Sequence, residues 1–268
     1  MGNPIPGTPT PRRVRLLGGD VDLVTPADVL RRVHVAASGG RPVLIGNHNA
    51  HSLFLIRRSA QLRAFFAEAD LIQIDSAPMI LWGRLLGLPL RRDMRSTYLD
   101  WRGDFWRLAD TRRWRVFYLG GAPGVAETAA ARLAESYPNV QIGCQHGYFD
   151  HATGSSENRQ VLARIAAFDP QVLLVGMGMP LQEHWALENR AAIQRGAILT
   201  VGAAFDYEAG AQTAAPRWTG ALGVEWLARL IGQPGRLAGR YLLEPWSLIG
   251  PALGDVAAAV TRPRGAAR

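Results

Sequence analysis

The sequence contains no lysine and a single cysteine. All 30 basic residues are arginine, and with 22 acidic residues they give a formal net charge of +8. The absence of lysine excludes a Walker-type phosphate loop, whose lysine reaches the terminal phosphates of a nucleotide. The lone Cys144 excludes an internal disulfide and favours a reducing cytoplasm. The positive charge favours an anionic partner, such as nucleic acid, lipid headgroups or a diphosphate-bearing substrate.

Long apolar runs are missing too. No window reaches the roughly 18 uninterrupted apolar residues that a spanning helix needs, so we expect any membrane contact to be peripheral. The N-terminus lacks the apolar core of a signal peptide and is rich in proline and glycine, which predicts a loose leader over residues 1–12. The histidines have no metal-like spacing with acidic or thiol residues, and no Gly-x-Ser-x-Gly elbow occurs. We therefore expect no metal site and no α/β-hydrolase.

Short apolar segments alternate with helical patterns between residues 13 and 212. This alternation predicts an α/β fold with a mainly parallel sheet between helical layers. The expected strands lie within 42–49, 70–75, 114–121, 140–149, 171–180 and 196–210, with further strands or a hairpin near the N-terminus. Residues 213–268 carry three tryptophans, seven arginines and only three acids, without a strand pattern. They are interpreted as a helical C-terminal appendage.

Four predicted strands end in polar or glycine-rich turns. These are GNHN (46–49), IDSAP (74–78), LGGAPG (119–124) and VGMGMPLQE (175–183). Ligands of open α/β sheets collect outside the carboxyl ends of the strands, so the four turns indicate a shared site. Each turn also has a plainer interpretation. The glycine turn is not in dinucleotide spacing and can be an ordinary strand-to-helix turn, and the asparagines can simply cap a helix.

Asp75 is a carboxylate at the end of a predicted buried strand. It can be satisfied by a backbone cap, or it can act as the general base for a hydroxyl nucleophile. A second carboxylate is not needed when the leaving group is already stable, as a nucleoside diphosphate is. That condition favours glycosyl transfer.

Several ordered motifs resemble one family. They are VFYLGGAPGVAETAAARLAESYP, HGYF, DPQVLLVGMGMPLQEHW, VGAAFDYEAG and APRWTGALGVEWLARLIGQPGRLAGRY. Together they resemble the WecB/TagA/CpsF glycosyltransferases of bacterial cell-surface polysaccharide synthesis, over about residues 13–245. The resemblance implies a Rossmann-like fold, an inverting hexosyltransferase, a UDP-sugar donor and a polyprenyl-diphosphate-linked sugar acceptor, with no metal or cofactor. It also implies a cytoplasmic protein, peripheral to the inner face of the cell membrane.

The resemblance also implies roles for particular residues. Asp75 aligns with the family's catalytic aspartate, and Asn47 and Asn49 would orient the sugar or base. The glycine turns would shape the nucleotide pocket, and arginines would meet the departing diphosphate. The implied substrate-binding residues are Asn47, Asn49, Arg92, Gly120, Gly121, Gly176, Gly178, Gln182, Glu183, Asp206, Arg217, Arg229, Arg236 and Arg240.

This sequence departs from the family pattern around Asp75. Ser76 and Pro78 stand where glycines are usual, and Arg95 and Thr97 replace a Gly and an Asp of a second motif. A non-catalytic nucleotide-sugar-binding homologue therefore stays open, as does, more remotely, a nicotinamide-dependent oxidoreductase without the usual glycine fingerprint. The appendage can lie on an anionic membrane surface or merely pack on the core, and a homo-oligomer is also open.

Overall fold

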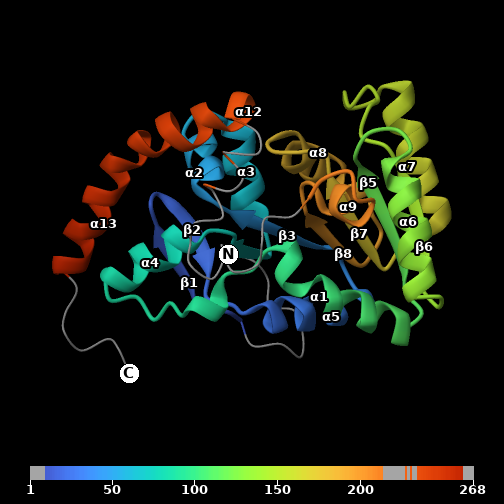
Figure 1. Cartoon of the computed structure of the whole chain (residues 1–268), viewed down its shortest axis with the longest axis horizontal. Coiled ribbons are helices and arrows are strands. Elements are labelled where there is room, and N and C mark those ends of the chain that lie inside the picture. The colour runs from blue at the N-terminus through green and yellow to red at the C-terminus, as the bar shows by residue number, and fades with distance from the viewer. Residues whose placement is uncertain (1–9, 214–226, 228–229, 231–233, 262–268) are drawn as a thin grey trace.

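The computed structural model of the chain describes residues 10–213, 227, 230 and 234–261 (Figure 1). Its main sheet is parallel, with six strands in the order β4-β3-β8-β7-β5-β6. A separate antiparallel hairpin joins β1 (Arg13–Leu16) to β2 (Gly19–Asp22). The strands of the main sheet are β3 (Val43–His48), β4 (Leu71–Ile74), β5 (Arg115–Gly120), β6 (Gln141–Gln145), β7 (Val172–Gly176) and β8 (Ala197–Thr200). Each predicted strand segment contains one of these strands, and the predicted α/β fold is confirmed.

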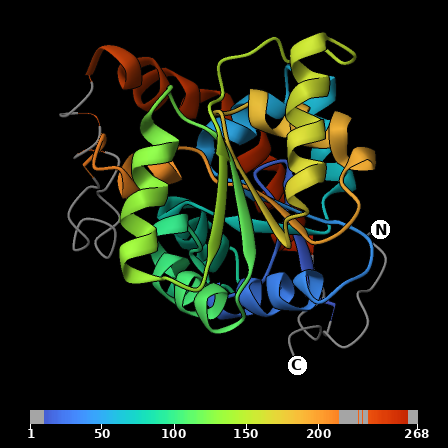
Figure 2. The same ribbon diagram turned by 90° about the vertical axis from the view of Figure 1, so that its right-hand side faces the viewer.

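Helices cover both faces of the sheet (Figure 2). They are α1 (Pro26–Ala37), α2 (Ala50–Ile56), α3 (Ala60–Glu68), α4 (Ala77–Leu85), α5 (Tyr98–Thr111), α6 (Val125–Ser136), α7 (Ser156–Phe168), α8 (Leu181–Asn189) and α9 (Ala204–Glu208), with short 3-10 turns η1 (Arg92–Met94) and η2 (Arg190–Ala192). Successive residues of a strand point to opposite faces. In β5, Val116 and Tyr118 join one buried cluster, whereas Phe117 and Leu119 join the other. The strand is therefore apolar from Val116 to Leu119 because both of its faces are covered.

The helices that follow the first two site turns, α2 and α4, begin with side-chain caps. Asn49 Oδ1 accepts the Ser52 N–H over 3.0 Å, and Ser52 Oγ accepts the Asn49 N–H over 2.9 Å, which closes a capping box at α2. Ser76 Oγ accepts the Met79 N–H at the start of α4. Asn49 thus serves as a cap, as the plainer interpretation expects, while it also lies at the carboxyl edge of the sheet.

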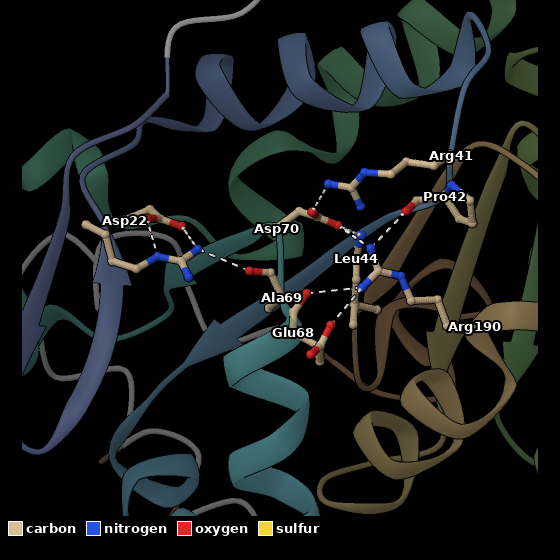
Figure 3. A network of polar contacts seen from close by, with 9 residues as sticks. Asp22, Arg41, Pro42, Leu44, Glu68, Ala69, Asp70 and Arg190 are labelled. Atoms are coloured by element: carbon tan, nitrogen blue, oxygen red, sulfur yellow. Dashed lines mark hydrogen bonds and ion pairs between the residues drawn. The ribbon is translucent and has the colours of Figure 1, made fainter. Parts of the chain in front are cut away.

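Ion pairs gather at the opposite, amino edge of the sheet (Figure 3). Asp70, which is 7% exposed, accepts from the Leu44 N–H over 2.9 Å, from Arg41 over 2.5 Å and from Arg190 over 2.7 Å. Nearby, Asp22 accepts hydrogen bonds from Arg13 of the hairpin. This network ties the hairpin, η2 and strands β3 and β4 together at the edge away from Asp75.

The described part of the C-terminal region is helical. It comprises α12 (Pro234–Ala238), a π-helical turn η3 (Gly239–Leu243), a 3-10 turn η4 (Glu244–Leu248) and α13 (Ile249–Thr261). In Figure 1 these elements, in orange and red, run along one side of the molecule from α2 past the hairpin. Asp255 Oδ2 accepts the Leu17 N–H over 2.8 Å and Trp82 Nε1–H over 3.0 Å, which attaches α13 to the hairpin and to α4. None of the helices in the described ranges has both the length and the apolar character needed to cross a bilayer.

Candidate active site

The carboxyl ends of the parallel strands open into one cleft of about 920 Å³, called here the polar cleft. Turns after β3, β4, β5, β7 and β8 all contribute to its wall, as the rule for open α/β sheets predicts. The predicted site residues found in this wall are Asn47, Asn49, Asp75, Gly121, Gly176, Gly178, Gln182, Asp206 and Arg240. Residues that lie far apart in the sequence therefore share one site.

A second cavity of about 550 Å³ adjoins the polar cleft. Its wall is mainly apolar and includes Met79 and Trp82 of α4 together with Leu248 and Ile249 from the C-terminal region. We call it the apolar cavity. Three residues, Asn49, Asp75 and Arg240, border both spaces. The candidate base thus stands where a polar compartment meets an apolar one.

Contacts from α2 hold the C-terminal wall of the apolar cavity in place. His51 Nδ1 and Glu244 Oε2 are 2.6 Å apart, and Arg57 donates to the Ser247 carbonyl oxygen. Burial lowers the pKa of His51, although the hydrogen bond to Glu244 opposes this. Arg240 Nη2 reaches Asn49 Oδ1 at 3.5 Å. Residues about 190 positions apart in the chain therefore close the cavity.

The floor of the polar cleft rests on a network of buried polar groups. Gln182 Oε1 accepts the Gly202 N–H over 3.1 Å, and Gln182 Nε2 donates to Glu183 Oε1 over 2.6 Å. Asn47 Nδ2 donates to the Thr200 carbonyl oxygen over 3.1 Å. Burial raises the pKa of Glu183 to about 7, although its hydrogen bonds partly oppose this. These hydrogen bonds hold the Gln182 and Glu183 side chains in place before a ligand binds.

Comparison with known proteins identifies the family. The family described as "Glycosyl transferase WecG/TagA/CpsF family" matches residues 14–259. The chain belongs to this glycosyltransferase family. The resemblance seen in the sequence is confirmed, and the protein is a glycosyltransferase.

Curated relatives of this glycosyltransferase occur in Staphylococcus aureus. Proteins of strains NCTC 8325 and COL are each 25% identical to it over 229 residues, which cover 82% of this chain and 84% of the relative. Both are named N-acetylglucosaminyldiphosphoundecaprenol N-acetyl-beta-D-mannosaminyltransferase. The similarity therefore extends over most of both chains rather than over one motif.

Some predicted residues of the glycosyltransferase lie outside both cavity walls. Gly120 packs β5 on β7, because a Cβ there would lie 2.2 Å from the Gly176 carbonyl oxygen. Glu183 is fully buried beneath Gln182. Arg92 is exposed on η1 and contributes to neither wall. Arg217 and Arg229 lie outside the described residues, as does the side chain of Arg236.

The sequence reasoning missed other residues of the site. Arg95 lines the apolar cavity, although in the sequence it stands out only as a departure from the family pattern. The polar cleft also contains the start of α5 and the loop after β6, including Tyr98, Tyr148 and Phe149. The HGYF motif covers the latter two and was a usable signal. At the start of α5 the only signal was Thr97, which stands where the family pattern has an Asp and which also lines the polar cleft. In the described ranges, no three His, Cys, Asp or Glu side chains gather as a metal site would require.

Proposed function

We propose that this protein is an inverting glycosyltransferase that moves a hexose-type sugar from a UDP-sugar to a hydroxyl of a polyprenyl-diphosphate-linked sugar. ManNAc, ManNAcA and glucose are the donor sugars considered, and the product would serve cell-surface polysaccharide synthesis. The observation that carries the proposal is the position of Asp75 at the junction of the polar cleft and the apolar cavity. The names of the staphylococcal relatives, which contain a diphosphoundecaprenol-linked sugar, support an acceptor of this class.

The polar cleft suits the donor. Its volume of about 920 Å³ falls within the usual range for small-molecule sites. Gly121 and Ala122, just before α6, line it, so the N-terminal end of this helix, which favours anions, lies next to the cleft. The Gly121 N–H itself donates to the Gly176 carbonyl oxygen. Gln182 and Asp206 add side-chain polar groups that can bind the ribose, base or sugar.

The apolar cavity suits the acceptor, which must carry both a sugar and an isoprenoid chain. Asp75 would take the proton from the acceptor hydroxyl as that oxygen attacks the anomeric carbon. The bond from this carbon to the diphosphate oxygen then breaks, and UDP leaves with the electron pair. Attack from the side opposite UDP inverts the anomeric configuration, and it requires donor and acceptor to approach from different sides. The two spaces on either side of Asp75 provide that arrangement.

The outer face of the C-terminal helices suits a membrane surface. Trp246, Leu253, Val256 and Val260 recur at helical spacing and are 41% to 80% exposed. An apolar stripe of this kind lies readily at a lipid interface, where a polyprenyl acceptor is held. This supports peripheral association with the inner face of the cell membrane and a role for residues 213–268 as an appendage. Pairing of the stripe with a second copy of the chain is the alternative.

The decisive test is a transfer assay with a panel of UDP-sugars and a polyprenyl-diphosphate-linked sugar. We expect the wild type to transfer sugar and Asp75→Asn to lose about 10²- to 10⁴-fold in kcat, the usual contribution of a general base. Asp93→Asn is the matched control, since Asp93 is an exposed residue of η1 that lines neither cavity. A full rate for Asp75→Asn would show that Asp75 is not the base. UDP binding without transfer would favour the non-catalytic homologue, and NADH binding without UDP binding would favour an oxidoreductase.

A further inference from the structure

The segment that follows η1 docks against the end of β4. Arg95 forms a parallel bridge with Ile74, and the Ser96 N–H donates to the Ile74 carbonyl oxygen over 2.9 Å. The Ser96 hydroxyl donates to Gln73 Oε1 over 2.6 Å, and both of these side chains are buried. Because Ile74 directly precedes Asp75, these bonds fix the backbone of Arg95 beside the candidate base.

A carboxylate orients the Arg95 side chain. Arg95 Nη2 lies 2.9 Å from Asp100 Oδ1, and the two side chains are 16% and 13% exposed. The other carboxylate oxygen, Oδ2, accepts from the Thr97 N–H over 3.0 Å and from its hydroxyl over 2.9 Å at the start of α5. Since the helix cap fixes Asp100, the guanidinium is held in position before any ligand arrives, which lowers the entropy cost of binding.

Arg95 lines the apolar cavity together with Arg240 and Asp75. Among the described residues, the charged groups in the cavity wall are thus two guanidinium groups and one carboxylate. His51 is a further titratable group in this wall. Elsewhere the wall consists largely of apolar side chains such as Trp82 and Leu248. This combination matches an amphiphile with an anionic head and an apolar chain, because each part meets its own kind of surface.

We propose that Arg95 binds the diphosphate of the lipid-linked acceptor inside the apolar cavity, an inference that rests on the proposed function. A planar guanidinium can donate two parallel hydrogen bonds to phosphate oxygens, which suits it to this group. With the diphosphate at Arg95, the isoprenoid chain lies along Trp82 and Leu248, and the attached sugar reaches toward Asp75. The family pattern has a glycine at this position, so Arg95 supplies a cation that the glycine would not.

The kinetic test uses two acceptors with the same sugar, one linked to farnesyl diphosphate and one an alkyl glycoside without phosphate. For Arg95→Met we expect the KM for the diphosphate acceptor to rise about 10- to 100-fold, with kcat, donor KM and glycoside KM changed by less than about 2-fold. Arg95→Lys should recover part of the loss, because it keeps the charge but not the planar fork. Arg91→Met is the matched control, since Arg91 is exposed and lines neither cavity.

Two kinetic outcomes overturn the inference. An unchanged KM of Arg95→Met for the diphosphate acceptor does so directly. An equal rise in KM for both acceptors does so as well, because Arg95 would then contact the sugar or support the fold. Calorimetric titration with farnesyl diphosphate tests the same contact without turnover. We expect the wild type to bind it at least about 10-fold more tightly than Arg95→Met, and equal affinities contradict the proposal. Absence of transfer by the wild type would refute the proposed function, while this titration would still test Arg95.

Discussion

Replacing Glu183 with glutamine is expected to stabilise the protein at neutral pH and to leave its stability near pH 4 almost unchanged. Glu183 is fully buried in the first turn of α8. Its Oε1 accepts from Gln182, whereas Oε2 has no hydrogen-bond partner among the described residues. Burial therefore raises the pKa of the carboxyl from 4.5 to about 7, with the hydrogen bond from Gln182 and the backbone acting in the opposite direction.

The magnitude follows from proton linkage. Between about pH 4.5 and 7 the folded protein keeps the Glu183 proton, whereas the unfolded chain has released it. The free energy of unfolding therefore falls as the pH rises through this window and stays constant above it. The pKa of Glu183 differs by about 2.5 between the folded protein and the unfolded chain, which corresponds to a decrease of about 3 kcal/mol in the free energy of unfolding across this window. Glutamine does not titrate, so the free energy of unfolding of Glu183→Gln does not decrease in this way.

A second buried group, His48, also makes stability depend on pH. The variant must therefore be compared with the wild type at each pH. Burial lowers the pKa of His48 to about 3, so the unfolded chain takes up a proton below pH 6.5 that the folded protein refuses. His48 therefore makes stability rise with pH from about 3 to 6.5, which masks the opposite effect of Glu183. The difference between the two proteins cancels the contribution of His48.

Urea denaturation from pH 4 to 8 provides the measurement. The free energy of unfolding of Glu183→Gln should exceed that of the wild type by an amount that grows to about 3 kcal/mol by pH 8. Glu188→Gln, on the exposed side of the same helix, controls for the loss of a carboxylate from α8. A difference that stays constant with pH, or one that reverses sign, would refute the reasoning, because Glu183 would then be charged in the folded protein.

Two further predictions concern the amino edge of the sheet and the C-terminal helix. Asp70→Ala should lower the free energy of unfolding by about 3 kcal/mol, since Arg41, Arg190 and a strand N–H lose their shared acceptor, with kcat retained by the folded fraction. Chemical denaturation checks this, and an unchanged midpoint contradicts it. A Leu253→Asp/Val260→Asp double variant should sediment with anionic liposomes about 10-fold less than the wild type, because it places charge in the apolar stripe. Unchanged sedimentation would show that the apolar stripe does not contact the membrane.

The parallel sheet was predictable because burial on both faces makes most positions of its inner strands apolar. The stretch from Val116 to Leu119 alternates between two core clusters, yet all four residues are large and apolar. Once the strands are parallel, their carboxyl ends must meet at one edge. The turns carrying Asn47, Asp75, Gly121 and Gln182 are therefore expected to converge, and they do.

The local sequence pattern could not show whether Arg92 or Arg95 lines the site. Both are arginines in the same short segment, and the family resemblance favours Arg92. The bridge from Arg95 to Ile74 and the buried bond from Ser96 to Gln73 place Arg95 at the cavity and leave Arg92 exposed. These bonds join residues about 21 to 23 positions apart, so no periodicity within the segment reports them.

Local sequence therefore specified the strands, the helix caps and the edge of the sheet at which a ligand must bind, because these depend on side-chain period and on neighbouring residues. The apolar cavity depends on folding of the whole chain. Its wall forms only when Glu244 reaches His51 and Asp255 reaches Trp82, contacts that span 193 and 173 positions. Such contacts arise from packing between finished elements. For this reason the carboxylate of Asp75 was visible in the sequence, whereas the two compartments that it separates were not.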